Sequence, residues 1–203
     1  MRTRYITSVA VAVILLLAGC SSEPLPEPSR AHRVRAECPA RTDSTFYFHP
    51  DDVDGQHVEY ASYFLAEVNA PSLSCGNIMD EGYRIARLAP GRPSAVIEVL
   101  HTQNGWSLRG VQFSGAVYRQ PATVTKQVRK NLADTQVAKV RALFDETDFW
   151  HTEPLPHFDG AYDGPWITLE ARRGSSYHVV FPLAQSFGIV TTTFFDMAGL
   201  AIE

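Results

Sequence analysis

The stretch with the most evident potential for chemistry runs from Asp159 to Glu170 and reads DGAYDGPWITLE. Its carboxylates stand at the first, fifth and twelfth places and a glycine at the sixth, which matches most of a calcium-binding loop. Such a loop also takes oxygen ligands at its third and ninth places, where this chain has Ala161 and Ile167. Prolines precede the stretch and a predicted hairpin follows it, whereas an EF-hand needs two helices. The sequence therefore predicts a turn that leads into a strand, and no calcium site.

The surrounding segment could also supply a general acid and base. A histidine held beside a carboxylate can move protons in such a site. Strand parity tests one pair, since a two-residue turn at 173–174 puts Glu170 and His178 on opposite faces of a sheet. This parity disfavours the dyad and predicts that His178 is a half-buried strand residue. The whole candidate set in 151–178 is His151, His157, Asp159, Asp163, Glu170 and His178.

Metal and cofactor motifs are weaker still. His151 and His157 lie six residues apart across two prolines, and no H-E-x-x-H motif or cysteine pair accompanies them. The chain has no nucleophile elbow, no P-loop and no Rossmann glycine pattern. We therefore assign no catalytic residue, no metal ligand and no cofactor from the sequence.

The first twenty residues carry the clearest signal. Arg2 and Arg4 precede ITSVAVAVILLL, an apolar run that is too short to span a bilayer but typical of a signal peptide. The run ends in LAGC (17–20), which resembles the lipobox of bacterial lipoproteins. The resemblance implies cleavage before Cys20, a diacylglyceryl group on its sulfur and a palmitate-type acyl chain on the new N-terminus. Each buried methylene contributes about 0.8 kcal/mol, so several chains make a stable membrane anchor. Ser21 resembles the residue that sorts Gram-negative lipoproteins to the outer membrane.

Charge and cysteine content fit a cell-envelope protein. Cleavage changes the formal charge from −4 to −6, because two of the 18 basic residues are lost while the 22 acidic ones remain. An acidic chain argues against nucleic acid as a partner. With Cys20 lipidated, Cys38 and Cys75 remain, and an oxidising compartment favours a disulfide between them. That bond would close a loop of about 37 residues and contribute roughly 3–4 kcal/mol.

The chain divides into three parts by composition. Residues 1–19 form the predicted signal peptide, and residues 20–37 form the lipidated cysteine with a tether rich in proline and serine. Residues 38–203 form a single globular domain of ordinary size.

Hydrophobic periodicity then predicts the elements of this domain. Helical spacing appears in 56–68, 125–144 and 189–200, and the longest of these has a basic outer face. Asn104-Gly105 indicates a hairpin turn. The fold class is α+β, an antiparallel sheet of about five strands with a long helix packed on one face. The predicted strands are 82–88, 94–101, 106–113, 166–171 and 176–181.

Three motifs together resemble a group of uncharacterised bacterial secreted and lipoprotein domains. They are FDETDFW (144–150), DGPWITLEARRGSSYHVVF (163–181) and FFDMAGL (194–200), and the similarity covers about 120 residues from Tyr83 onward. The group more often has Arg-Trp-x-Pro where this chain has Phe181-Pro182. The resemblance implies a fold class but no activity. The match is carried by Phe149, Trp150, Asp163, Gly164, Trp166, Leu169, Glu170, Tyr177, His178 and Val179.

Three functions remain open at this point. The leading hypothesis is a membrane-anchored, non-catalytic lipoprotein that binds an envelope protein or another envelope component. The second is a periplasmic hydrolase or metal-dependent enzyme that uses the 151–178 set. The third is a small-ligand binding module with an aromatic-lined pocket. The aromatic side chains that could form either a core or a binding surface are Phe149, Trp150, Tyr162, Trp166, Tyr177 and Phe181.

Overall fold

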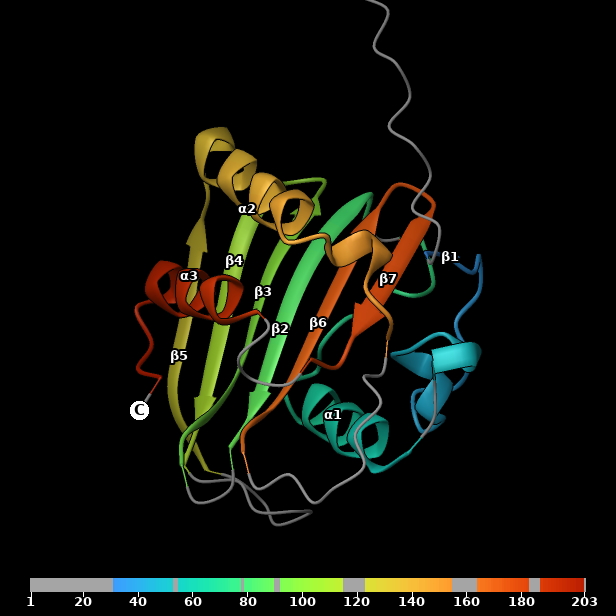
Figure 1. Ribbon diagram of the computed structural model, residues 1–203, viewed down its shortest axis with the longest axis horizontal. Helices are drawn as coiled ribbons and strands as arrows, with labels where there is room; N and C mark the ends of the chain where they lie inside the picture. Colours follow the sequence, from blue (N-terminus) through green and yellow to red (C-terminus); the bar gives the residue numbers. More distant parts are fainter. Residues whose placement is uncertain are drawn as a thin grey trace, which may run out of the picture.

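The protein is described by a computed structural model, which shows a sheet with helices on both faces (Figure 1). The described residues are 31–52, 55–77, 79–89, 92–114, 123–154, 164–182 and 187–202. Within them, no helix combines the length and apolar character that crossing a bilayer requires.

The described residues form a central antiparallel sheet of seven strands. Its order is β1-β7-β6-β2-β3-β4-β5. The predicted α+β class is confirmed, but the sheet has seven strands where about five were expected. The strands are β1 (His32–Arg33), β2 (Glu81–Leu88), β3 (Ser94–Thr102), β4 (Gly105–Phe113), β5 (Val124–Asn131), β6 (Trp166–Arg173) and β7 (Ser176–Val180).

In the part of the chain that the structure describes, three α-helices and three short 3-10 turns surround the sheet. The helices are α1 (Gly55–Glu67), α2 (Asp134–Glu146) and α3 (Gly188–Ala198). The turns are η1 (Ser44–Phe46), η2 (Pro50–Asp52) and η3 (Phe149–His151). The predictions of helices at 56–68 and 189–200 are thus close to α1 and α3.

The prediction of one long helix over 125–144 is wrong. The first part of this range is strand β5, and α2 covers only 13 residues from Asp134. Lysine, arginine and glutamine favour helix in isolation, but β5 pairs along most of its length with β4, and this tertiary pairing overrides the local preference. The apolar spacing already breaks between Leu132 and Val137, where the strand ends and the helix begins.

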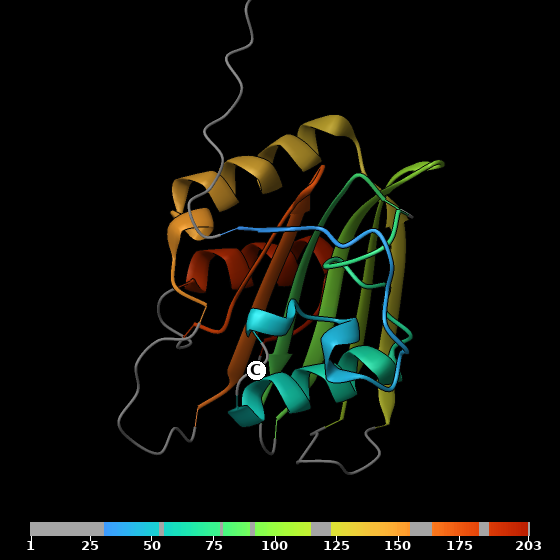
Figure 2. The same cartoon turned by 90° about the vertical axis from the view of Figure 1, so that its right-hand side faces the viewer.

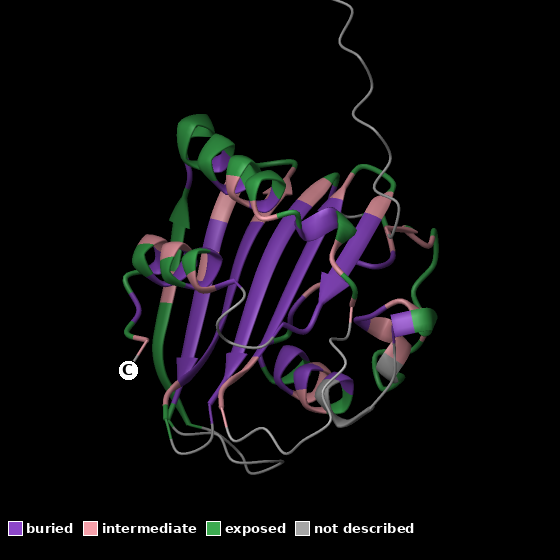
Figure 3. Cartoon of the chain, viewed as in Figure 1, coloured by how far each residue is buried: buried purple, intermediate pink, exposed green. Residues whose placement is uncertain are grey.

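Both faces of the sheet are buried, which also departs from the one-sided packing that was expected. On one face, α2 and α3 pack against the sheet through Val140, Phe144 and Phe194 (Figure 1). On the opposite face, α1 packs through Phe64 and Leu65. The central strands are therefore buried along most of their length (Figure 3). This burial explains why the polar residues of these strands must find partners inside the protein.

The β6–β7 hairpin preserves the predicted parity but has another register. Arg173 pairs with Ser176, so the turn consists of Gly174 and Ser175, and Glu170 lies opposite Val179. Gly174 has a φ of +56°, which suits glycine at this turn. Because both registers have a two-residue loop, Glu170 and His178 point to opposite faces, as the sequence predicted.

The N-terminal segment is attached to the sheet before the disulfide. Residues 31–37, which composition places in the tether, contain β1, and β1 pairs with β7. The Arg35 side chain then donates hydrogen bonds to the backbone oxygens of Thr45 and Phe48. A disulfide joins Cys38 to Cys75, as predicted. Figure 2 shows this segment in blue, crossing toward η1 and η2. The packed domain therefore includes residues that were assigned to the tether.

Candidate functional site

The acid–base set predicted in 151–178 does not converge in the part of the chain that the structure describes. His157, Asp159 and Asp163 lie outside the described residues. His151 is exposed on η3, where its Nδ1 lies 2.8 Å from Asp148 Oδ1. Glu170 is buried on the α1 face of the sheet. The described members of the set therefore occupy three separate environments.

His178 belongs to the core on the α2 face. Its Nε2 lies 2.9 Å from the backbone oxygen of Thr152. Its ring contacts Phe149 edge-on, at 5.1 Å between ring centroids. The side chain is fully buried, not half-buried as predicted, because η3 covers the end of β7. This histidine therefore joins η3 to the sheet.

The aromatic cluster is divided between the two cores. Phe149 and Trp150 are buried on the α2 face, whereas Tyr177 and Phe181 are buried on the α1 face. Trp166 packs at the edge of the α1-side core, and Tyr162 lies outside the described residues. The described members therefore stabilise the fold and form no common binding surface.

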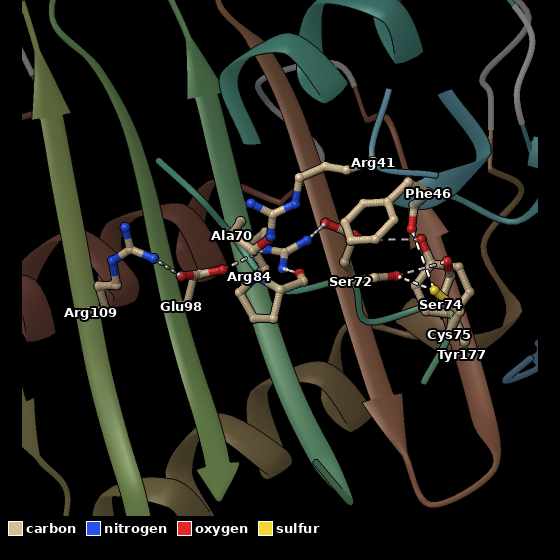
Figure 4. Close-up of polar contacts among 12 residues, drawn as sticks. Arg41, Phe46, Ala70, Ser72, Ser74, Cys75, Arg84, Glu98, Arg109 and Tyr177 are labelled. Carbon is tan, nitrogen blue, oxygen red and sulfur yellow. Dashed lines mark hydrogen bonds and ion pairs between the residues drawn. The ribbon is translucent and has the colours of Figure 1, made fainter. Parts of the chain in front are cut away.

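Four charged residues of the sheet form one connected network on the α1 face (Figure 4). Arg84 lies at its centre and is fully buried on β2. Its Nε donates to Glu98 Oε1 at 2.9 Å, and its Nη1 donates to Glu170 Oε2 at 2.6 Å. Glu98 also binds Arg109, at 3.4 Å from Nη1 to Oε2. Two guanidinium groups thus balance two carboxylates.

The same network closes the end of α1. Arg84 donates a hydrogen bond to the backbone oxygen of Pro71, and Arg109 donates one to that of Val68. Arg41 donates to the oxygen of Ala70 at 3.1 Å. Carbonyl groups that follow a helix lack partners within the helix, so cationic side chains stabilise them there. The network therefore docks the C-terminal end of α1 onto the sheet.

Burial sets the protonation behaviour of this network. Desolvation raises the pKa of Glu170 above its ordinary value, although Arg84 and the hydroxyl of Tyr177 oppose the shift. The Tyr177 hydroxyl donates to Glu170 Oε1 at 3.1 Å, and burial raises its pKa as well. Because Arg84, Glu98 and Glu170 are at most 1 % exposed, no substrate reaches them. The arrangement is suited to holding the fold together.

A second polar cluster, which the sequence analysis missed, lies at the N-terminal segment. His32 of β1 and His49 stack with parallel rings, 4.0 Å between their centroids. Asp51 Oδ2 lies 3.5 Å from His49 Nδ1 and 4.0 Å from His32 Nδ1. The side chain of Asp51 is 73 % exposed, so the cluster is open to solvent. We call His32, His49 and Asp51 the histidine cluster.

Asp52 supports the histidine cluster from the interior. Its Oδ1 lies 3.1 Å from His32 Nε2, and its side chain is 2 % exposed. Its Oδ2 has no hydrogen-bond partner among the described residues. Desolvation raises the pKa of Asp52, and the neighbouring His32 opposes that shift. Desolvation and the nearby His32 also lower the pKa of His49, although Asp51 opposes the shift, so burial favours the neutral ring.

Sequence reasoning missed the cluster because its members are far apart in the chain. His32 fell within the predicted tether, and His49 stands before Pro50, Asp51 and Asp52 with no recognised spacing. The one available signal was the string HPDD (49–52), a histidine beside two carboxylates.

Comparisons of this chain with protein-family models, with curated proteins and with solved structures found no match.

Proposed function

We propose that the protein is a lipid-anchored lipoprotein of the cell envelope that binds an extended, acidic segment of another envelope protein and catalyses no reaction. The anchor is supported by LAGC (17–20) after a short apolar run. The acid–base set predicted in 151–178 supports binding without catalysis. Its members within the described residues are separated from one another, and those that are buried have hydrogen-bond partners. The single observation that supports a binding surface is the exposed edge of β5.

β5 is the last strand in the sheet order and is exposed at all but one of its residues. Among the described residues, no strand pairs with its outer side. Its backbone donors and acceptors there can pair with an added strand. The strand has no acidic residue, and an acidic segment complements its charge. The basic side chains of this surface, which we call the β5 edge, are Lys126, Arg129 and Lys130.

The anchor is tested by Cys20→Ser. Because the acyl chains attach through this sulfur, we expect the variant to lose palmitate labelling and to leave the membrane fraction. Membrane fractionation of cells grown with labelled palmitate measures both effects. Cys38→Ser is the matched control, since it removes a cysteine without removing the acylated one. A Cys20→Ser variant that still labels and still sediments with membranes would contradict the anchor.

The binding surface is tested by a photo-reactive side chain placed at Gln127, which is exposed on β5. We expect light-dependent adducts in whole envelopes, and mass spectrometry should identify an acidic, extended segment as the attached partner. R129E/K130E should reduce the adducts about five- to tenfold, because two charge contacts become repulsive. R92E/K139E changes the net charge equally at two exposed sites away from β5 and should leave the adducts unchanged.

Two results would contradict this function. One is the absence of a specific adduct at Gln127. The other is an adduct that R129E/K130E leaves intact, which would mean that the basic residues only protect the edge from aggregation. Neither result bears on the anchor, because the anchor is measured separately.

A further inference from the structure

We propose that His32, His49 and Asp51 bind a divalent transition-metal ion of the Zn²⁺ class, with Asp52 orienting His32. The inference does not depend on the proposed function, because the histidine cluster lies at the β1 end of the sheet and β5 lies at the other. It rests on the hydrogen bonds around the cluster, the spacing of its donor atoms and its supporting carboxylate.

Three atoms that can each offer a lone pair to a cation lie close together. When His32 is neutral and Asp52 is ionised, the carboxylate can only accept, so His32 Nε2 carries the hydrogen and His32 Nδ1 keeps its lone pair. The backbone N–H of Asp51 donates to His49 Nδ1 at 3.3 Å, so that nitrogen is also an acceptor. Asp51 Oδ2, close to both, is a third acceptor. A cation between them would bind all three atoms and would replace the long hydrogen bond from the Asp51 N–H to His49 Nδ1.

The spacing suits a small ion after a modest adjustment. One donor atom from each residue lies within 4.8 Å of those of the other two. Tetrahedral zinc with bonds of about 2.0–2.1 Å needs ligand atoms roughly 3.3 Å apart. The parallel rings must tilt toward each other, and the terminal torsion of histidine allows this because it is broad. Asp51 is largely exposed and moves freely enough to close the remaining distance.

Asp52 provides the support that metal-binding histidines usually have. A histidine ligand commonly donates its other ring N–H to a carboxylate, which fixes the tautomer and the ring orientation. His32 has this arrangement with Asp52 at 3.1 Å. The second oxygen of Asp52 is buried without a hydrogen-bond partner among the described residues. A positive charge at the cluster would offset the cost of burying this carboxylate.

The ligand types define the class of ion. Two imidazoles and one carboxylate suit Zn²⁺, Co²⁺, Ni²⁺ and Cu²⁺, whereas Ca²⁺ and Mg²⁺ prefer oxygen ligands alone. Three protein ligands leave a coordination position for water. A bound ion would also join β1 to η2, because His32 belongs to the first and Asp51 to the second. The ion would therefore fasten the segment that follows the tether.

The test is calorimetric titration of the full-length protein in detergent, without a histidine tag, using Zn²⁺ and separately Mg²⁺. We expect saturable binding of one Zn²⁺ per chain and none of Mg²⁺. Co²⁺ should give the intense visible absorption of a tetrahedral site. Failure to bind Zn²⁺, Co²⁺, Ni²⁺ and Cu²⁺ saturably would overturn the proposal.

The variants separate this site from adventitious binding. His49→Ala and Asp51→Asn remove ligands that are partly exposed, and each should weaken Zn²⁺ binding at least about tenfold. Asp52→Asn should weaken it about 10–100-fold, because it removes the support of a ligand. His151→Ala is the matched control, since His151 also lies beside an aspartate on the surface, and it should bind Zn²⁺ like the wild type. Equal affinity in His49→Ala and the wild type would overturn the proposal.

Discussion

Replacing Arg84 with methionine is expected to lower the free energy of unfolding by about 3–5 kcal/mol. The substitution keeps most of the side-chain volume but leaves Glu98 and Glu170 buried without the guanidinium that both of them bind. Urea unfolding of the full-length protein in detergent, followed by circular dichroism, measures the loss. Such a loss is a large share of the 5–15 kcal/mol that is typical of folded domains.

Two further variants show whether the unpaired charges cause this loss. Arg129→Met changes an exposed arginine of the same sheet and should stay within about 0.5 kcal/mol of the wild type. R84M/E98L/E170L also removes the carboxylates and keeps only Arg109, which is partly exposed. It should regain most of the stability, because apolar replacement of fully buried ion pairs is often neutral. An Arg84→Met variant within about 1 kcal/mol of the wild type would contradict the role of the network.

Removing the disulfide is expected to have an effect of similar size. C38A/C75A should lose about 3–4 kcal/mol, because the bond restricts a long loop in the unfolded chain. The enclosed loop has a sequence separation of 37 and contains α1. Urea unfolding measures the loss in the same way as for Arg84→Met.

Dithiothreitol provides the internal control for this second experiment. It should destabilise the wild type by about as much as the double substitution does and leave C38A/C75A unchanged. If C38A/C75A unfolds at the same urea concentration as the oxidised wild type, the bond contributes nothing measurable and the expectation is wrong.

The strands were the most predictable part of the fold. Alternation located β2, a β-branched run located β3, and Asn104-Gly105 marked the turn that leads into β4. Parity in the β6–β7 hairpin was also predictable, because it depends only on an even number of loop residues. The register was not predictable. A turn at 173–174 and a turn at 174–175 place the same side chains on each face of the sheet, so the pattern of apolar residues does not distinguish them.

The elements at the two edges of the sheet could not be predicted locally. Half of the residues of β5 are lysine, arginine or glutamine, which favour helix, and the pairing of β5 with β4 makes it a strand. β1 has two residues and no periodicity to detect. β1 becomes a strand by pairing with β7, which is distant in sequence. β5 becomes a strand by pairing with β4. Neither pairing can be read from the local sequence.

The candidate sites were hidden for a different reason. Arg84, Glu98 and Glu170 stand between apolar residues of their strands, so a signal existed. Their mutual contact depends on the order β6-β2-β3 in the sheet. The histidine cluster combines His32 with His49 and Asp51. Hydrophobic periodicity does not indicate that His32 lies close to the other two residues in the fold. In both cases the chemistry arises from the topology.

The position of the disulfide also determines how the domain would bear mechanical tension. If the chain is held at Cys20 while a partner holds the domain, the pull arrives first at the few backbone hydrogen bonds of residues 32–35, which can open one at a time. At Cys38 the pull crosses directly to Cys75, a short distance before β2. The enclosed segment, with η1, η2 and α1, lies outside this path. The central strands would carry the load while the α1 side stays folded.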